Sequence, residues 1–360
     1  MRILCVIDSL GSGGAQRQIL SLAEMLKERN YDICLLAYYQ DDFFKDKFDE
    51  LNIPLHFVLE GRPIHRIFKV RKFIRNGDYD VVISFLETPD FLNNFSSIGG
   101  KKWKVITSER SAKKSTFQSR KGKLYAWFQR YSDLLVCNSY NAKAMWEKYY
   151  PQYKDKLVVV YNPVILPKIN SEYEPRKYGK LHIVVAASFQ YMKNPIGLIN
   201  SLALLSLDER KKIVIDWYGN AEVIKGDTRA YDESEKKIIE NCLQDIIHLH
   251  KPTKDIANIM NKADMVALFS ELEGLPNAIC EGMMLSKPIL MSRVSDYSIL
   301  VDKTNGFLCD WDDVVSIKEA LVSAISLSTE QLITMGEKSK EKAVVLFSPE
   351  FVVTQWINLF

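Results

Sequence analysis

Short runs of apolar residues alternate along the whole chain with longer amphipathic stretches, and this alternation constrains the fold more than any other feature. Between the apolar runs, stretches such as Gln16–Arg29 place apolar residues at the period of a helix. Continuous apolar strands separated by helices indicate parallel sheets covered on both faces. The runs that we predict as strands are RILCVID, YDICLLAYY, DVVISFL, KVITSE and LLVCNS in the first half, and LHIVVAAS, IVIDWYG, IIHLH, DMVALFS and KPILMS in the second.

The alternation stops at Tyr161–Lys180, where three prolines stand among polar residues, and this segment is typical of an interdomain linker. A chain of 360 residues also exceeds the size at which one hydrophobic core keeps growing. We therefore predict an α/β protein with two Rossmann-like domains, each built on a parallel sheet. The predicted parts are residues 1–162, a linker at 163–180, residues 181–348, and a closing helix at 349–360.

Composition excludes several classes of protein. No apolar run approaches the roughly 18 residues of a membrane-spanning helix, and MRILCVID is too short for a signal-peptide core. The six cysteines form no C-x-x-C pair, which favours free thiols in a reducing compartment and a cytoplasmic location. The five histidines show no metal-ligand spacing; we interpret His248 and His250 as packing residues and predict no metal site.

The most informative segment is residues 264–292, DMVALFSELEGLPNAICEGMMLSKPILMS. Here DMVALF is a predicted buried strand, residues 270–275 form the loop that leaves it, and Pro276 begins a helix at its favoured first position. A helix that begins at the edge of a sheet presents free N–H groups and the positive end of its dipole. This start therefore predicts a binding site for phosphate.

Glu281 is the unusual residue of that helix. It lies in AICEGMML, which is apolar nearly all round, so we predict that its side chain is buried. A buried carboxylate needs polar partners, and either ligand hydroxyls or an internal Arg or Lys would serve. Glu281 should lie about 7.5 Å along the axis from the helix start, roughly the span from a diphosphate to its ribose. Gly282 should allow the backbone to approach a neighbour closely.

Glu273 and Glu281 form an E-x7-E pattern around Gly-Leu-Pro. This pattern resembles the signature of retaining glycosyltransferase family 4, the group 1 glycosyl transferases, whose B-type fold has two facing Rossmann-like domains. The likeness covers nearly the whole chain and includes the opening glycine loop, Asn162-Pro163, Lys193, Gly219, the EGLPNAICE core, the turn at Asn305–Leu308 and a closing helix that packs back on the N-terminal domain.

The resemblance implies roles for individual residues. Glu273 would contact the donor sugar, Glu281 would bind the ribose hydroxyls, and Lys193 would neutralise the departing diphosphate; Lys193 and Glu273 are the catalytic candidates. Ser188 stands where many relatives have an arginine, so one cation of the family pattern is missing, but we still expect Ser188 among the donor-binding residues. The remaining residues that we expect on the donor side are Gly13, Gly14, Gly274, Leu275, Pro276 and Asn277.

The first glycine loop follows the first predicted strand. Gln16 stands where the dinucleotide fingerprint G-x-G-x-x-G needs its last glycine, which disfavours a nicotinamide dehydrogenase. The resemblance implies that Gly13 and Gly14 let this loop approach the diphosphate and the acceptor, although a turn without a ligand is the alternative. In the loop VITSERSAKK, Glu109 and Arg110 are acceptor-side candidates, and Arg110 is also the candidate for the missing cation.

Two stretches of the first half are rich in basic and aromatic residues. Lys101–Arg130 holds ten Lys or Arg against one Glu, and Arg62–Arg75 holds six with no acid. This composition suits docking on an anionic membrane surface. No nucleic-acid-binding module accompanies the charges, so we expect no nucleic-acid partner. Ordinary solvated helix faces are the alternative.

The resemblance implies a retaining glycosyltransferase. It would move a hexose or N-acetylhexosamine from a nucleotide diphosphate sugar, which we expect to be a UDP-sugar, to a lipid-linked saccharide for a surface polysaccharide. We expect no metal and no other cofactor, because Lys193 and the helix start would supply the positive charge at the site. The free thiols and the basic stretches favour a location in the cytoplasm at the inner face of the membrane. A nucleotide-sugar epimerase, a sugar phosphorylase, or a non-catalytic sugar- or lipid-binding relative remain alternatives.

Overall fold

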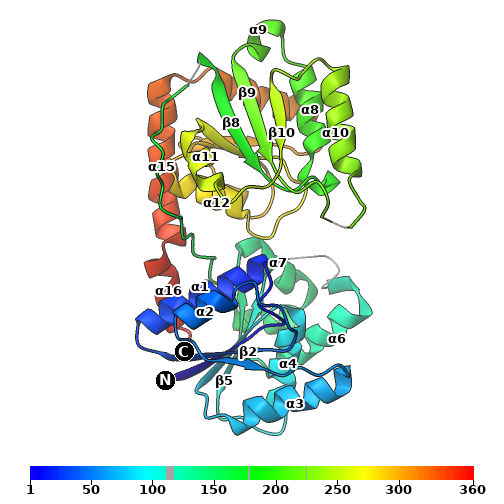
Figure 1. Ribbon diagram of the computed structural model, residues 1–360, viewed down its shortest axis with the longest axis vertical. Helices are drawn as coiled ribbons and strands as arrows, with labels where there is room; N and C mark the ends of the chain where they lie inside the picture. Colours follow the sequence, from blue (N-terminus) through cyan, green and yellow to red (C-terminus); the bar gives the residue numbers. More distant parts are fainter. Residues whose placement is uncertain (111–116, 177–178, 224) are drawn as a thin grey trace. The chain divides into compact units, whose positions relative to one another are not determined.

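The computed structural model describes residues 1–110, 117–176, 179–223 and 225–360 (Figure 1). The chain divides into two compact units, and each is built on one parallel sheet. The first unit comprises Met1–Pro163 and Pro349–Phe360, and the second comprises Val164–Ser348. The predicted α/β fold class with two parallel sheets is therefore confirmed. Across the described ranges, no helix is both long and apolar enough to span a bilayer.

The first unit contains a seven-stranded sheet in the order β3-β2-β1-β4-β5-β6-β7. The order reverses direction between β1 and β4, and in such sheets ligands bind beside the carboxyl ends of the strands at the reversal. The strands are β1 (Arg2–Val6), β2 (Asp32–Ala37), β3 (Leu55–Phe57), β4 (Val81–Phe85), β5 (Lys104–Glu109), β6 (Leu134–Cys137) and β7 (Leu157–Val159); the α-helices are α1 (Gly14–Glu28), α2 (Lys45–Glu50), α3 (Pro63–Asn76), α4 (Glu87–Ser97), α6 (Arg120–Phe128), α7 (Tyr140–Tyr149) and α16 (Pro349–Ile357).

The last helix of the chain, α16, belongs to the core of this first unit. It packs beside α1 (Figure 1). Its apolar side chains Val352, Val353 and Trp356 are buried. The Trp356 ring stacks on that of Phe85 at a centroid distance of 6.0 Å. The two ends of the chain therefore build one hydrophobic core.

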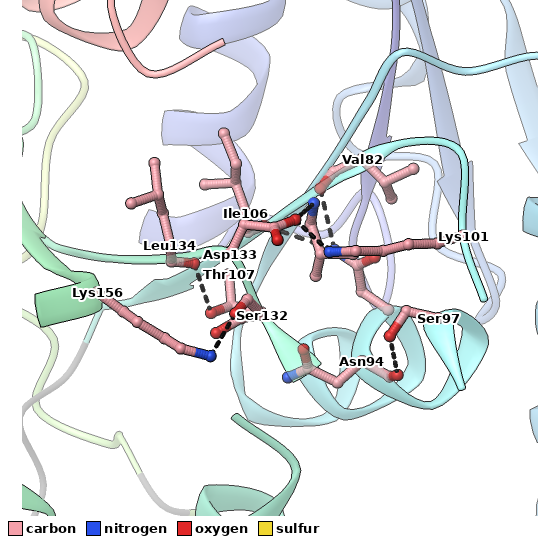
Figure 2. A network of polar contacts seen from close by, with 12 residues as sticks. Val82, Asn94, Ser97, Lys101, Ile106, Thr107, Ser132, Asp133, Leu134 and Lys156 are labelled. Atoms are coloured by element: carbon pink, nitrogen blue, oxygen red, sulfur yellow. Dashed lines mark hydrogen bonds and ion pairs between the residues drawn. The ribbon is translucent and has the colours of Figure 1, made fainter. Parts of the chain in front are cut away.

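Polar contacts fix the ends of β5 and β6 in the first unit, as Figure 2 shows. The carboxylate of Asp133 accepts hydrogen bonds from Val105 N at 2.7 Å and from the Lys101 ammonium. Lys156 Nζ lies 2.6 Å from the Ser132 carbonyl oxygen and 2.9 Å from that of Arg130. Burial lowers the pKa of Lys156. At least one lysine of the basic stretch 101–130 thus stabilises the fold.

The second unit contains a six-stranded sheet in the order β10-β9-β8-β11-β12-β13, which reverses direction between β8 and β11. The strands are β8 (Leu181–Ala186), β9 (Ile213–Tyr218), β10 (Ile247–His250), β11 (Met265–Leu268), β12 (Ile289–Ser292) and β13 (Gly306–Cys309); the α-helices are α8 (Pro195–Ala203), α9 (Leu207–Arg210), α10 (Arg229–Glu240), α11 (Ile256–Lys262), α12 (Asn277–Met284), α13 (Tyr297–Leu300), α14 (Val314–Ile325) and α15 (Thr329–Phe347).

Three strands, β3, β7 and β13, were not predicted from the sequence. Each contains only three or four residues and lies at the edge of its sheet. The apolar pattern is weak in two of them, because His56 interrupts β3 and Gly306 begins β13. The segment Asn305–Leu308, which was expected to be a turn, instead runs into β13.

Residues just after Pro163 pack on the second unit, although the sequence predicts a linker there. The Tyr173 hydroxyl donates to Asp264 Oδ1 at 3.0 Å, and Arg176 N donates to the same oxygen at 2.7 Å. Ser171 lies against α11, where Asn261 Nδ2 donates to its carbonyl oxygen at 2.7 Å. Within the described residues, Ser171, Tyr173 and Arg176 therefore attach this segment to the second unit.

Candidate functional site

Lys193 and Glu273, the two catalytic candidates, lie together in the second unit. Lys193 follows β8 and Glu273 follows β11, and these two strands are neighbours at the reversal of the sheet. Lys193 Nζ donates to Glu273 Oε1 at 2.6 Å, and their side chains are only 18% and 12% exposed. Eighty positions separate the two residues in the chain, yet the fold brings them into an ion pair.

Further contacts hold this pair in place. Ser270 Oγ donates to Glu273 Oε1 at 2.7 Å, so one carboxylate oxygen accepts from both the lysine and the serine. The backbone N–H of Glu271 donates to the Met192 carbonyl oxygen at 2.8 Å and joins the two loops. The loop geometry therefore holds the ion pair in position.

The turn that carries Lys193 has a local cause. Tyr191–Lys193 form one turn of 3₁₀-helix, and Asn194 then adopts a left-handed conformation with φ at 60°. Asparagine tolerates this region, and its Oδ1 caps α8 by accepting from Gly197 N at 3.1 Å. Asn194 Nδ2 also donates to the Trp311 carbonyl oxygen at 2.6 Å. Lys193 thus lies immediately before the start of α8, which the hydrogen bonds of Asn194 hold in place.

Two predictions about α12 are corrected by the structure. Pro276 is the N-cap residue and Asn277 the first helical residue, because Pro276 has φ −77° and ψ 83°. Glu281 then lies about 6 Å along the axis from the helix start, which is shorter than predicted. Glu281 is half-buried rather than buried, because its face of the helix is not covered completely.

The loop before α12 places its backbone beside the ion pair. The Gly274 carbonyl oxygen accepts a hydrogen bond from Ser295 Oγ, and Leu275 is buried. Proline at the N-cap has no side chain that could accept from the first N–H groups of the helix. The start of α12 therefore has the electrostatic character of an anion site, with Asn277 exposed at its first position.

Two glycines of this unit are required by packing. A Cβ on Gly282 would lie 2.8 Å from Val266 Cβ, so the close neighbour of this helix position is strand β11. A Cβ on Gly219 would lie 1.9 Å from the Ala187 carbonyl oxygen. Both glycines let the loops and helices around the site approach the sheet. Ser188, half-buried, follows Ala187 in the same loop.

Gly13 and Gly14 lie in the first unit, at the start of α1. Gly13 is the N-cap with φ −73°, and a Cβ on Gly14 would meet nothing within 4 Å. Neither position needs the left-handed region. Gln16 Nε2 donates to Asp8 Oδ1 at 2.8 Å and fastens this loop to the end of β1. The backbone at Gly14 is therefore open, whereas the Gln16 side chain lies close beside Gly13, where a Cβ would be 2.2 Å from Gln16 Oε1.

The first unit has a hollow of about 370 Å³ at the reversal of its sheet. It lies where β1, β4 and β5 end, which is the expected place for a ligand in such a sheet. Glu109 and Arg110, the acceptor-side candidates, both line it. The complete lining consists of Asp8, Tyr38, Tyr39, Leu86, Glu87, Thr88, Pro89, Asp90, Ser108, Glu109 and Arg110.

Asp90 is a lining residue that the sequence did not single out. Its Oδ1 accepts from Ser84 Oγ at 2.6 Å and from Ser108 N at 3.3 Å. Burial raises the pKa of Asp90 well above the ordinary value, and the nearby charge of Glu109 raises it further. Leu86, the N-cap residue of α4 and four residues before Asp90, has φ at 84°, a strained conformation for a leucine. No sequence pattern marks this strain.

Glu109 and Arg110 are both anchored within the first unit. Glu109 Oε2 accepts from Trp146 Nε1 at 3.3 Å. The Arg110 guanidinium lies 3.8 Å from the centre of the Phe85 ring, and its Nη1 donates to Asn162 Oδ1 at 2.7 Å. Burial lowers the pKa of Arg110 to about 9. Of the predicted site residues, the fold thus brings Lys193 into contact with Glu273 and places Glu109 and Arg110 on this hollow.

Two protein families match the chain. Residues 12–166 match the family described as Glycosyltransferase Family 4, and residues 168–342 match the one described as Glycosyl transferases group 1. The two matches meet at residues 166 and 168, close to the division between the two units.

Two curated relatives and two solved structures are similar to the chain over nearly its full length. The α-1,4-N-acetyl-D-galactosaminyltransferase of Campylobacter jejuni, named for the acceptor GalNAc-α-(1→4)-GalNAc-α-(1→3)-diNAcBac-PP-undecaprenol, is 23% identical over 89% of this chain and 88% of its own. An uncharacterised glycosyltransferase of Methanocaldococcus jannaschii is 24% identical over 91% and 89%. Anabaena HepE in complex with UDP has a TM-score of 0.85 at 17% identity, covering 100% of this chain and 99% of HepE. The lipopolysaccharide outer core galactosyltransferase WaaB has a TM-score of 0.78 at 14% identity, covering 99% and 98%.

Proposed function

The chain belongs to the group 1 glycosyltransferases with the two-domain B-type fold, and we propose that it transfers a hexose or N-acetylhexosamine from a UDP-sugar to a lipid-linked saccharide with retention of configuration. The observation that carries this proposal is the ion pair of Lys193 and Glu273, 2.6 Å apart beside the start of α12. A fixed cation next to a helix N-terminus suits a departing diphosphate.

In the proposed reaction, the bond between the sugar and the diphosphate breaks, and the acceptor hydroxyl attacks the same face of the sugar. The leaving phosphate oxygen takes the proton of that hydroxyl. Lys193 and the backbone at Gly274, Leu275 and Asn277 would stabilise the negative charge that develops on the phosphates. Glu273, oriented by Ser270, would hold a sugar hydroxyl. The Lys193 ammonium and these backbone groups would supply the positive charge that the phosphates need, so we predict no metal at this site.

The identity of the donor and acceptor rests on the relatives. HepE, which shares the fold, has been solved with UDP and with UDP-glucose, and this supports a uridine nucleotide. The Campylobacter relative is named for an acceptor on undecaprenyl diphosphate, and this supports a lipid-linked saccharide. The hollow of the first unit, with Glu109 and the buried Asp90, would bind hydroxyls of the acceptor.

An acceptor on a lipid would bring the first unit to a membrane surface, and α3 suits such a surface. Ile64 and Phe68 are 68% and 58% exposed on this helix, among basic residues. Fewer basic side chains of α3 are left to contact a surface than the sequence suggested, because Arg71 and Arg75 donate to carbonyl oxygens at the end of α4. Exposed apolar side chains with a basic surround favour peripheral binding to anionic lipid. Lys113 and Lys114, part of the predicted basic surface, lie outside the described residues.

Co-sedimentation with vesicles of anionic lipid tests this docking. The Phe68→Ser variant should lose most of its vesicle binding, whereas Val345→Ser, at a residue 62% exposed on α15, should keep it. Binding should also weaken as salt is added, because ions screen surface charges. If both variants bind the vesicles equally, Phe68 on α3 takes no part in membrane binding.

The transferase proposal is tested by incubating the chain with a set of nucleotide sugars and a lipid-linked saccharide, with products read by mass spectrometry. We expect a new glycoside from a UDP-sugar, with the anomeric configuration of the donor in its NMR spectrum. Lys193→Met should lower kcat by about 10²–10³-fold, and Lys254→Met, an exposed lysine of the same unit, should not. An epimerised sugar or a sugar phosphate formed without acceptor would contradict the proposal.

A further inference from the structure

Three histidines of the second unit surround one carboxylate, Asp216. His248 Nδ1 and His250 Nε2 lie 3.0 Å and 2.8 Å from Asp216 Oδ1. His182 Nε2 lies 2.7 Å from the other oxygen, Oδ2. We expected His248 and His250 to serve in packing; their rings do pack on neighbouring rings, and both also contact this shared acid.

Strand register brings these four residues together. Asp216 pairs with His248 of β10 on one side and with Val184 of β8 on the other. Side chains two residues apart on a strand point to the same face. His250, two residues after His248, and His182, two before Val184, therefore share the face of Asp216. The cluster spans three neighbouring strands and involves residues far apart in the chain.

This face of the sheet is open at the cluster. The side chains of the four residues are between 18% and 43% exposed. On the opposite face of β9, Ile213, Ile215 and Trp217 are completely buried under helices. The Tyr218 ring stacks on that of His250 at 4.4 Å and limits the freedom of the imidazole. The cluster is thus accessible to a small ion and partly held in place.

We propose that Asp216, His248 and His250 bind one divalent transition-metal ion of the zinc type. One donor atom of each residue lies within 4.8 Å of the others, and the residues are the ligand types that zinc prefers. Zinc bonds of about 2.0–2.2 Å imply ligand atoms about 3.3 Å apart, which small side-chain rotations can provide. Two imidazoles and one carboxylate leave the fourth position for water.

His182 has a different role in this site. Its Nε2–H donates to Asp216 Oδ2, whereas the other two histidines contact Oδ1, and so it fixes the orientation of the carboxylate. Such a partner in a metal site typically changes metal affinity by about 10–100-fold. The ion would connect β9 to β10, the edge strand of the sheet. The ligands are separate from Lys193 and Glu273, so the site does not depend on the proposed transfer reaction.

Calorimetric titration of the full chain with Zn²⁺ at neutral pH tests the proposal, on protein that carries no histidine tag. We expect one saturable site. His250→Gln should weaken its affinity by at least 100-fold, and His182→Gln by about 10–100-fold. His65→Gln, at an exposed histidine of the first unit, and Cys242→Ser, at an exposed thiol, should leave the affinity unchanged.

A second measurement uses only the unsubstituted chain and does not depend on how the variants fold. Zn²⁺ should protect His248 and His250 from modification by diethyl pyrocarbonate, mapped by mass spectrometry, and should leave His65 reactive. The proposal is overturned if no saturable binding occurs up to millimolar Zn²⁺, if Cys242→Ser removes it, or if Zn²⁺ protects no histidine of the cluster.

Discussion

Glu281 illustrates how much a single position on α12 depends on the exact start of the helix. The carboxylate is half-buried, one turn beyond Asn277, on the helix that begins beside the Lys193–Glu273 pair. A carboxylate at this distance can accept from two hydroxyls of a ribose while the diphosphate occupies the helix start. Its assignment to the ribose stays a prediction.

We expect Glu281→Gln to weaken UDP binding by about 10–100-fold, because hydrogen bonds to a charged group contribute about 1.5–3 kcal/mol. Isothermal titration with UDP measures the change. Glu271→Gln is the matched control, since Glu271 is exposed in the loop before the same helix. Unchanged affinity for Glu281→Gln would refute the ribose assignment.

Lys287 is a buried lysine that the sequence did not mark. Its Nζ donates to the Asn261 carbonyl oxygen at 2.5 Å and lies 3.5 Å from the centre of the Tyr173 ring. Burial lowers the pKa of Lys287 to about 7. At and below neutral pH the buried Lys287 ammonium therefore destabilises the folded chain. This destabilisation determines how the free energy of unfolding changes with pH.

The folded chain releases the Lys287 proton near pH 7, whereas the unfolded chain keeps it to about pH 10.4. Between these values the unfolded state binds more protons, so the contribution of Lys287 to the free energy of unfolding rises with pH. We expect Lys287→Met to be more stable by about 1–4 kcal/mol at pH 6. This advantage over the unsubstituted chain should shrink toward pH 10.

Denaturant unfolding at several pH values measures this difference, with Lys262→Met, an exposed lysine of α11, as the control. The control should show no such trend. A stability difference between Lys287→Met and the unsubstituted chain that stays constant from pH 6 to pH 10 would contradict the lowered pKa.

At the scale of elements, the packing of α12 against α15 depends on one glycine. A Cβ on Gly336 of α15 would lie 2.1 Å from the Ser286 carbonyl oxygen, just after α12. Backbone atoms cannot move aside as a flexible side chain would, so the two elements would have to separate. This contact supports the helix that carries Glu281.

Gly336→Ala should therefore lower the free energy of unfolding by about 1–3 kcal/mol, even though alanine favours a helix by about 1 kcal/mol over glycine. Glu337→Ala changes the exposed neighbour on the same helix and should have little effect. Chemical denaturation compares the two variants. A more stable Gly336→Ala chain would mean that helix propensity outweighs the contact.

At the scale of the whole molecule, the two units differ in how they use the chain. The second unit is continuous, whereas the first combines Met1–Pro163 with the last twelve residues, Pro349–Phe360. Trp356 is the largest side chain that this final segment adds to the core of the first unit. The end of the chain should therefore control the stability of its beginning.

We expect Trp356→Ala to destabilise the first unit by about 3–5 kcal/mol, the usual cost of removing a buried aromatic side chain. Hydrogen exchange read by mass spectrometry should show faster exchange in Met1–Pro163 and little change in Val164–Ser348. Phe351→Ala, at a residue 41% exposed on the same helix, should have a small effect. Equal loss of protection in both units would contradict the division.

The local pattern of the sequence was enough for the fold class. The ten predicted strands all occur, because long apolar runs bounded by turn residues carry a strong local signal. The edge strands β3, β7 and β13 escaped prediction; in β3 and β13 the apolar run is interrupted, by His56 and by Gly306. For the site, the E-x7-E pattern pointed to the loop and helix where Glu273 and Glu281 lie.

What local pattern could not decide is which distant residues meet. The ion pair of Lys193 with Glu273, the strained loop beside Asp90 and the convergence of three histidines on Asp216 all join different strands. Such contacts depend on strand order and register, which arise from the packing of the whole sheet. Periodicity determined the elements of this protein, and tertiary structure alone decided the partners of its charged residues, because a side chain's partner depends on neighbours in space.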